Sequence, residues 1–192
     1  CSTISYYKQS VAGQLQLLHA RQDIKSLLNS DKTNPELKQR LKSITSIRNF
    51  ASKTLGLPDN KSYRSYADIG RRYIVWNVFA TPALSFEAKS SCFLIVGCLS
   101  YRGYFKKEDA SRYMNTLKDT GFDVFLGGVT AYSTLGWFDD PVLNGMLEKD
   151  DFDLARLIFH ELAHQQLYIK NDTEFNEAFA DAVALIGIDH WA

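Results

Sequence analysis

A five-residue segment near the end of the chain constrains the fold more than any other feature. This segment, His160-Glu161-Leu162-Ala163-His164, lies within residues 151–169, where apolar residues recur at helical spacing. In an α-helix, residues four positions apart project from the same face, about one turn from each other. Flanking apolar residues indicate that the helix is held in a core: Leu154, Leu157, Ile158 and Leu162. We therefore expect a buried helix that presents two histidines side by side.

Two imidazoles so placed can bind one Zn²⁺ ion, each at about 2.0–2.1 Å. Glu161 follows the first histidine and can reach a water on the metal without occupying a ligand position, as a general base must. The sequence therefore predicts His160 and His164 as metal ligands and Glu161 as the catalytic base. The alternative is that this short motif arises by chance and that both histidines are simply hydrogen-bonded.

A catalytic zinc site with two histidines needs a third ligand, and a second helical segment at residues 173–186 supplies a candidate. If this helix folds back beside the first, Glu177 projects toward the metal. Asp181 lies one turn later on the same face and is placed to accept the free N–H of a ligand histidine. We expect one zinc ion bound by His160, His164 and Glu177.

The first third of the chain predicts helices. Residues 5–29 and 35–55 each carry apolar residues at helical spacing and are joined by a short turn, which favours an antiparallel helix pair within residues 5–56. Together with the sheet and the two C-terminal helices described below, this pair predicts a single α+β domain over residues 1–192.

The middle of the chain, residues 73–128, predicts a small, mostly antiparallel sheet, because β-branched and aromatic residues dominate there. Its expected strands are residues 73–80, 84–87, 93–99 and 123–126, with a helix at 108–119 and an irregular segment at 129–141. Two helices over residues 151–187 close the chain and carry the predicted metal site.

Composition excludes several classes of protein. With 45% hydrophobic residues the chain can bury a core, so overall disorder is excluded. The 22 basic and 22 acidic residues balance, whereas a nucleic-acid-binding domain is typically strongly basic. The longest apolar run, residues 92–99, is far shorter than the roughly 20 residues of a membrane-spanning helix.

The three cysteines leave alternatives open. Cys92 and Cys98 form an even pair, which suggests a disulfide in an oxidising compartment, but two buried free thiols fit equally well. Cys1 is the first residue and precedes a polar stretch, as in a bacterial lipoprotein whose processed N-terminal cysteine carries the lipid. The alternative is an arbitrary boundary. If Cys1 is lipidated, the chain is anchored to a membrane without spanning it.

The two C-terminal motifs resemble those of the gluzincins, a group of metallopeptidases that includes thermolysin-like enzymes and aminopeptidases. The segment Asn176-Glu177-Ala178-Phe179-Ala180-Asp181 follows the His-Glu-x-x-His motif as in that group. The resemblance implies a zincin-like fold in which His160, His164 and Glu177 bind zinc, Glu161 is the general base and Asp181 supports a ligand.

A closer resemblance extends over nearly the whole chain, to the bacterial predicted-aminopeptidase lipoproteins. The segments that carry it are residues 65–68, 73–79, 101–105, 131–141 and 159–164. It implies a zinc-dependent aminopeptidase acting on a peptide substrate. It also implies a lipid anchor at Cys1 and a place in the bacterial cell envelope, at the outer membrane facing the periplasm.

Peptide hydrolysis requires a donor for the oxyanion, and Tyr132 is the first candidate. It follows Gly127-Gly128-Val129 about thirty residues before the zinc motif, where related peptidases place a substrate-binding strand; the alternative is a packed loop aromatic. Weaker candidates are Arg102, Tyr104 and His190. An aminopeptidase also needs a carboxylate for the substrate amine, for which the candidates are Glu87, Asp139 and Asp140.

Two other functions remain open from the sequence. One is a zinc amidohydrolase acting on a non-peptide or peptidoglycan-type amide, with the same ligands and a different cleft. The other is a non-catalytic binding lipoprotein whose metal site is a relic. The presence of Glu161 argues against the relic, because this residue contributes nothing to metal binding.

Overall fold

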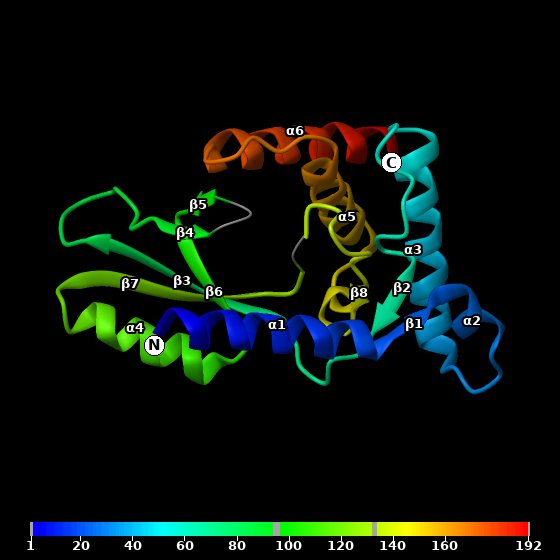
Figure 1. Cartoon of the computed structure of the whole chain (residues 1–192). Coiled ribbons are helices and arrows are strands. Elements are labelled where there is room, and N and C mark those ends of the chain that lie inside the picture. Colours follow the sequence, from blue (N-terminus) through cyan, green and yellow to red (C-terminus); the bar gives the residue numbers. More distant parts are fainter. Residues whose placement is uncertain (1, 94–96, 132–133, 192) are drawn as a thin grey trace.

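The computed structural model describes residues 2–93, 97–131 and 134–191 and has an α+β fold (Figure 1). Its elements are α1 (Ser2–Ala20), β1 (Arg21–Asp23), α2 (Ile24–Asn29), α3 (Pro35–Lys53), β2 (Ser65–Ala67), β3 (Val75–Pro82), β4 (Ser91–Phe93), β5 (Gly97–Leu99), β6 (Tyr101–Tyr104), α4 (Lys107–Lys118), β7 (Phe122–Val129), β8 (Val142–Leu143), a 3₁₀ turn (Asn144–Glu148), α5 (Asp151–Gln166) and α6 (Thr173–Trp191).

One half of the molecule is an antiparallel sheet of order β6–β3–β7. Helix α4 covers one of its faces (Figure 1). Val78 and Ala80 of β3 point to that face and are buried against α4, in agreement with the alternation of side chains along a strand. This half confirms the predicted antiparallel sheet and the helix expected at residues 108–119.

The other half is helical. Helices α3, α5 and α6 share the largest hydrophobic core with a small mixed sheet of order β1–β2–β8. The ring of Phe50 on α3 lies 5.9 Å from that of Phe159 on α5 and 5.1 Å from that of Trp191 on α6. Ile158 and Leu162 of α5 are fully buried. The packing therefore fixes α5, which carries the two predicted histidine ligands.

The predicted helix pair within residues 5–56 is wrong in part. The first helix ends at Ala20, because residues 21–23 pair with residues 65–67 as a strand. Asp23 then caps the short helix α2, accepting a hydrogen bond from the backbone N–H of Ser26 at 2.9 Å. Helix α2 packs against α3, whereas α1 runs separately along the base of the molecule (Figure 1).

The strand predicted at residues 84–87 is also wrong. Pro82 ends β3, and the N–H of Ser85 donates to its carbonyl in a turn that places Leu84 at φ 61°. The strand predicted at residues 93–99 is instead the hairpin β4–β5, in which Cys92 pairs with Cys98 and their sulfurs are bonded at 2.04 Å. The disulfide is thus the form that the structure adopts.

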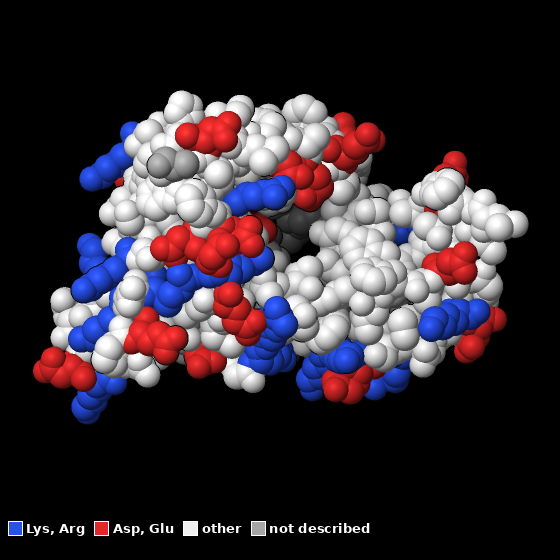
Figure 2. Space-filling model, turned by 180° about the vertical axis from the view of Figure 1, so that it is seen from behind, with Lys and Arg blue, Asp and Glu red and all other residues white. Residues whose placement is uncertain are grey.

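A hollow separates the sheet half from the helical half beneath α6 (Figure 2). Acidic and basic side chains both lie at its rim, so neither sign of charge dominates there (Figure 2). The N–H of Cys98 in β5 donates to Asn171 Oδ1 in the α5–α6 turn at 3.0 Å, which ties the hairpin to the helical half. Among the described residues, no helix has the length and apolar character needed to cross a membrane.

Candidate metal centre

Helix α5 begins where Asp150 caps it, with the side chain accepting a hydrogen bond from the N–H of Asp153 at 2.8 Å. Its apolar residues pack into the helical core and leave His160 and His164 on the face toward α6. Both C-terminal helices form where the sequence predicts them, although α6 extends to Trp191.

The turn between α5 and α6 is held by Asn176. Its amide accepts a hydrogen bond from the N–H of Ile169 at 2.8 Å and donates one to the carbonyl of Ile169 at 2.7 Å. Asn171 adopts the left-handed conformation in the same turn, at φ 67°. Asn176 is 1% exposed and directly precedes Glu177, so it positions that carboxylate. This role of Asn176 could not be inferred from the sequence, because an asparagine after a turn is only a weak indication that its amide is buried and hydrogen-bonded to the backbone.

The three predicted ligand side chains lie together. His160 Nε2 is 3.1 Å from His164 Nε2 and 3.3 Å from Glu177 Oε2, and His164 Nε2 is 3.7 Å from Glu177 Oε1. One ligand atom from each residue lies within 4.8 Å of the others. The two helices thus bring two imidazoles and one carboxylate to a common point.

The donor set fits a tetrahedral cation. Ligands bound to zinc at about 2.0–2.1 Å with tetrahedral angles lie about 3.3 Å apart, close to the separations observed here. His160 Nδ1 lies 3.1 Å from Asp181 Oδ1, and if it donates to that acid, its Nε2 presents a lone pair. A single proton on His164 Nε2 can serve only one of the two acceptors facing it, whereas a cation serves all three. Whether a metal binds here stays a prediction.

The remaining nitrogen of His164 has an unusual environment. Its Nδ1 atom is buried and has no hydrogen-bond partner among the residues that the structure describes. Asp181, which supports His160, also lies 3.7 Å from Arg156 Nη2. The two histidines therefore differ: Nδ1 of His160 faces an acidic residue, whereas Nδ1 of His164 faces no hydrogen-bond partner among the described residues.

Glu161 is buried beside these groups and is only 8% exposed. Burial raises the pKa of its carboxyl from 4.5 to about 7, with His160 opposing the change and Asp140 and Glu177 adding to it. A carboxyl that titrates near neutral pH suits a general base.

The histidines and their acid respond to one another. Burial lowers the pKa of His160, but the hydrogen bond with Glu177 and the nearby carboxylates outweigh it and raise the pKa overall. Burial lowers the pKa of His164. The hydrogen bond from His160 lowers the pKa of Glu177 despite partial burial. Without a metal, these shifts favour ionised Glu177, neutral His164 and a protonated His160, and a metal ion would take the place of the His160 proton that faces Glu177.

Tyr101 is a functional candidate that the sequence analysis missed. It lies on β6, and burial raises its pKa to about 12, with further contributions from the charges of Glu177 and Glu161. The charges of both glutamates thus act on the Tyr101 hydroxyl. Tyr168, after α5, is also near Glu177, whose charge adds to the effect of burial in raising the pKa of Tyr168. No residue pattern within a single strand signals this proximity, because it depends on how the sheet meets α6.

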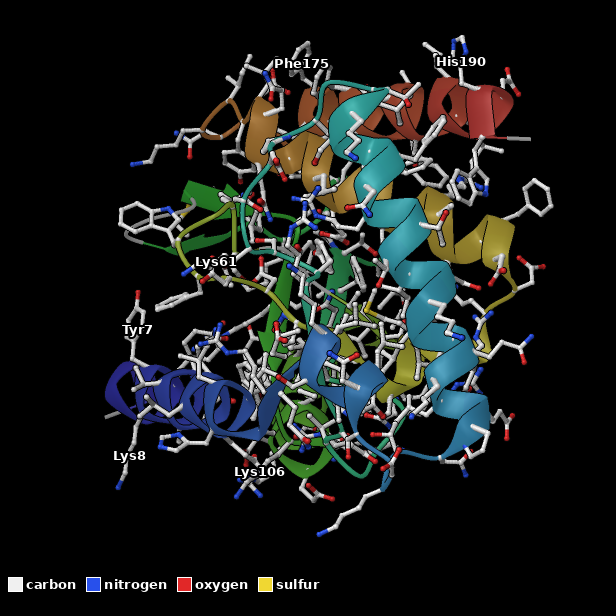
Figure 3. All side chains as sticks on the ribbon, turned by 90° about the vertical axis from the view of Figure 1, so that its right-hand side faces the viewer. Tyr7, Lys8, Lys61, Lys106, Phe175 and His190 are labelled. Atoms are coloured by element: carbon white, nitrogen blue, oxygen red, sulfur yellow. A yellow bond between two sulfur atoms is a disulfide. The ribbon has the colours of Figure 1, made fainter. Side chains whose placement is uncertain are left out.

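The predicted oxyanion donors lie elsewhere. Tyr132 lies outside the described residues. Arg102 and Tyr104 occupy the opposite face of β6 from Tyr101, and the Arg102 guanidinium lies 4.2 Å from the centre of the Tyr6 ring. His190 is exposed at the far end of α6 from Phe175, which lies two residues before Glu177 (Figure 3). The structure therefore does not bring Arg102, Tyr104 or His190 to the converging side chains.

The candidate carboxylates for a substrate amine are also dispersed. Glu87 is exposed in the loop after β3, and Asp139 lines a separate cavity described below. Asp140 is 2% exposed, and its carboxylate accepts hydrogen bonds from the N–H and hydroxyl of Thr134 at 2.9 and 2.8 Å. Asp140 therefore holds the loop before β8 in place, and burial raises its pKa to about 6.

A family model described as "Putative aminopeptidase" matches residues 5–192. The chain belongs to this family. The match confirms the predicted aminopeptidase family, and the family name favours peptidase activity. In this aminopeptidase family member the converging side chains and Glu161 all lie within the matched residues. No curated protein matches the chain, and no solved structure does.

Proposed function

We propose that the chain is a zinc-dependent peptidase of the gluzincin type, with a zincin-like arrangement of α5 and α6 and aminopeptidase activity. The observation that carries the proposal is the convergence of His160, His164 and Glu177 within 4.8 Å, beside the buried Glu161. The family name supports peptide hydrolysis as the reaction. His160, His164 and Glu177 would hold the zinc ion.

A zinc ion held there would supply a Lewis acid, able to lower the pKa of a water molecule to about 7 and to polarise the scissile carbonyl. Glu161 accepts a proton from the attacking water and then delivers it to the departing amine, so its carboxyl returns to its starting state. Its pKa of about 7 suits both directions of transfer near neutral pH. Asp181 orients His160 through Nδ1.

Tyr101 is the side chain of this proposal that donates to the developing oxyanion. Its pKa of about 12 keeps the hydroxyl protonated, so that it can donate a hydrogen bond at neutral pH. The electrostatic effect of Glu161 and Glu177 on its hydroxyl supports this role. Tyr101 thus replaces the Tyr132 of the sequence prediction as the first candidate.

The proposal extends to location. We propose that Cys1 carries a lipid and that the enzyme faces the periplasm from the outer membrane. The Cys92–Cys98 disulfide supports the location in the periplasm, because such bonds persist in oxidising compartments. Mass spectrometry of the N-terminus from the native source tests it, and an unmodified Cys1 amine and thiol would contradict it.

The decisive experiment measures zinc content and hydrolysis together. We expect one zinc per chain and turnover of aminoacyl amides that a chelator abolishes. Glu161→Gln should retain the zinc and lose turnover by about 10²–10⁴-fold, as expected for removal of a general base. Glu174→Gln is the matched control, because this glutamate is exposed on α6.

Each outcome separates the alternatives. Absence of stoichiometric zinc would contradict the metal centre itself. Full zinc occupancy with no hydrolysis of peptides would favour a binding protein or an amidohydrolase of another substrate. Cleavage of N-blocked peptides alone would retain the peptidase and remove the aminopeptidase assignment.

A further inference from the structure

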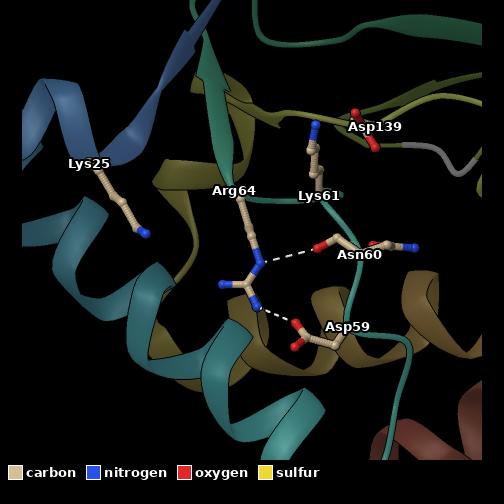
Figure 4. Close-up of a pocket in the computed structure, with 6 residues that line it drawn as sticks. All are labelled: Lys25, Asp59, Asn60, Lys61, Arg64 and Asp139. Atoms are coloured by element: carbon tan, nitrogen blue, oxygen red, sulfur yellow. Dashed lines mark hydrogen bonds and ion pairs between the residues drawn. The ribbon is translucent and has the colours of Figure 1, made fainter.

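A second site lies on the α2 side of the molecule, formed by residues that the peptidase proposal does not use. It is an open cavity of about 620 Å³ lined by Lys25, Asp59, Asn60, Lys61, Arg64 and Asp139 (Figure 4). A neighbouring cavity of about 340 Å³ shares Lys25, Lys61, Arg64 and Asp139 with it. The shared residues make the two cavities parts of one depression.

Cations outnumber carboxylates around this depression. Its lining includes five cationic side chains and three carboxylates, and two of the carboxylates are already engaged. Asp23 accepts hydrogen bonds from the backbone and hydroxyl of Ser26, and Asp59 pairs with Arg64 at 2.5 Å. The cationic residues are Arg21, Lys25, Arg48, Lys61 and Arg64.

Arg48 lines the smaller of the two cavities and is 1% exposed. Its guanidinium donates to the carbonyls of Ser62, Pro58 and Asn60 and to the hydroxyl of Ser52, and every one of these acceptors is neutral. A buried cation without an anionic partner is costly, and the free energy falls when an anion approaches it. The burial that isolates Arg48 also lowers its pKa to about 10.

The two lysines are uncommitted. Lys25 and Lys61 form no ion pair with any residue that the structure describes. Figure 4 shows the Lys25 side chain extending from α2 toward Arg64, so that two cationic side chains approach each other. The Arg64 guanidinium is held at this edge by hydrogen bonds from its three nitrogens to Asp59, the carbonyl of Asn60 and the side-chain oxygen of Asn49. A bridging anion relieves this repulsion.

We propose that this depression binds a phosphate group, either as inorganic phosphate or as the phosphate of a small monoester. Phosphate has several acceptor oxygens and a charge near −2 at pH 7, so it can accept hydrogen bonds from the two free ammonium groups and offset the charge of the arginines better than a single carboxylate does. The volume exceeds that of phosphate alone, which leaves room for the organic part of a monoester.

The test is calorimetric titration of the full chain with inorganic phosphate and, separately, with glycerol 3-phosphate. We expect saturable binding, weakened at least tenfold in the double variant Lys25→Gln/Lys61→Gln. Both lysines are exposed, so the variant should fold. Lys42→Gln, at an exposed lysine on α3 outside the depression, is the matched control and should bind within about twofold of the unmodified chain.

The two probes distinguish the source of the phosphate. Tighter binding of glycerol 3-phosphate than of inorganic phosphate assigns the monoester, and the reverse order assigns the free ion. Absence of saturable binding, or equal affinity in the double variant and the unmodified chain, overturns the proposal. Phosphate held at the metal centre instead would leave the affinity unchanged in the double variant, so it counts against the depression as the site.

Discussion

The buried carboxyl of Glu161 makes a quantitative prediction for the metal-free protein. Replacing it by glutamine removes its charge and keeps its size and shape. The folded protein raises the pKa of this carboxyl from 4.5 to about 7, chiefly because burial disfavours the ionised form. Glu161→Gln therefore reports what that ionised form costs in free energy of unfolding.

The sign follows from where the proton is held. Between pH 4.5 and about 7 the unfolded chain releases this proton while the folded chain retains it. The contribution of Glu161 to the free energy of unfolding is thus fully present below pH 4.5, is lost as the pH rises to about 7, and does not change above that pH. The difference between the unfolded and folded pKa values corresponds to about 3 kcal/mol in the free energy of unfolding. Glutamine does not ionise, so between pH 4.5 and pH 8 the free energy of unfolding of the variant should rise by about 3 kcal/mol relative to that of the unmodified chain.

Urea unfolding at pH 4.5 and pH 8, with a chelator present, measures this difference. We expect the two proteins to be nearly equally stable at pH 4.5 and the variant to be more stable at pH 8. Glu174→Gln should show no pH-dependent difference, because Glu174 is exposed. A variant whose relative stability is the same at both pH values would refute the reasoning from burial.

Three further predictions concern the metal ligands, the oxyanion donor and the packing around Gly145. Glu177→Ala should abolish stoichiometric zinc, whereas Asp181→Asn should retain it with affinity lowered about 10–100-fold, both measured by competition with a chromophoric chelator. Tyr101→Phe should lower kcat about 10²–10³-fold with little change in KM, and an unchanged kcat would remove Tyr101 from the mechanism. Gly145→Ala should destabilise the fold by about 1–3 kcal/mol in thermal or urea unfolding, because the added methyl group overlaps the carbonyl oxygen of Arg72.

The C-terminal helices were the most predictable part of the fold. Their helical periodicity runs over many residues, and the spacing of His160, His164 and Glu177 depends only on helix geometry and one turn. Residue identity alone therefore indicates which side chains meet. The hold of Asn176 on the turn was not predictable, because its two hydrogen bonds use backbone atoms that any sequence offers.

The errors fall where pairing is non-local. The strand at residues 21–23 exists because residues 65–67 lie beside it, and its three residues give no periodic signal that would interrupt a predicted helix. Tyr101 was missed for a related reason: its neighbours Glu161 and Glu177 lie about sixty and seventy-six positions further along the chain. Only the packing of the sheet against the helical half brings them together.

The two hydrogen bonds between the Asn176 amide and the backbone of Ile169 determine which substitutions the turn tolerates. Because the amide holds only main-chain atoms, every residue type except proline presents the same two groups at position 169. The side chain at position 169 can therefore be exchanged by evolution or by engineering while the third ligand keeps its place. Position 169 is thus free to vary in residue type, whereas Asn176 must be kept to hold the Glu177 carboxylate in place.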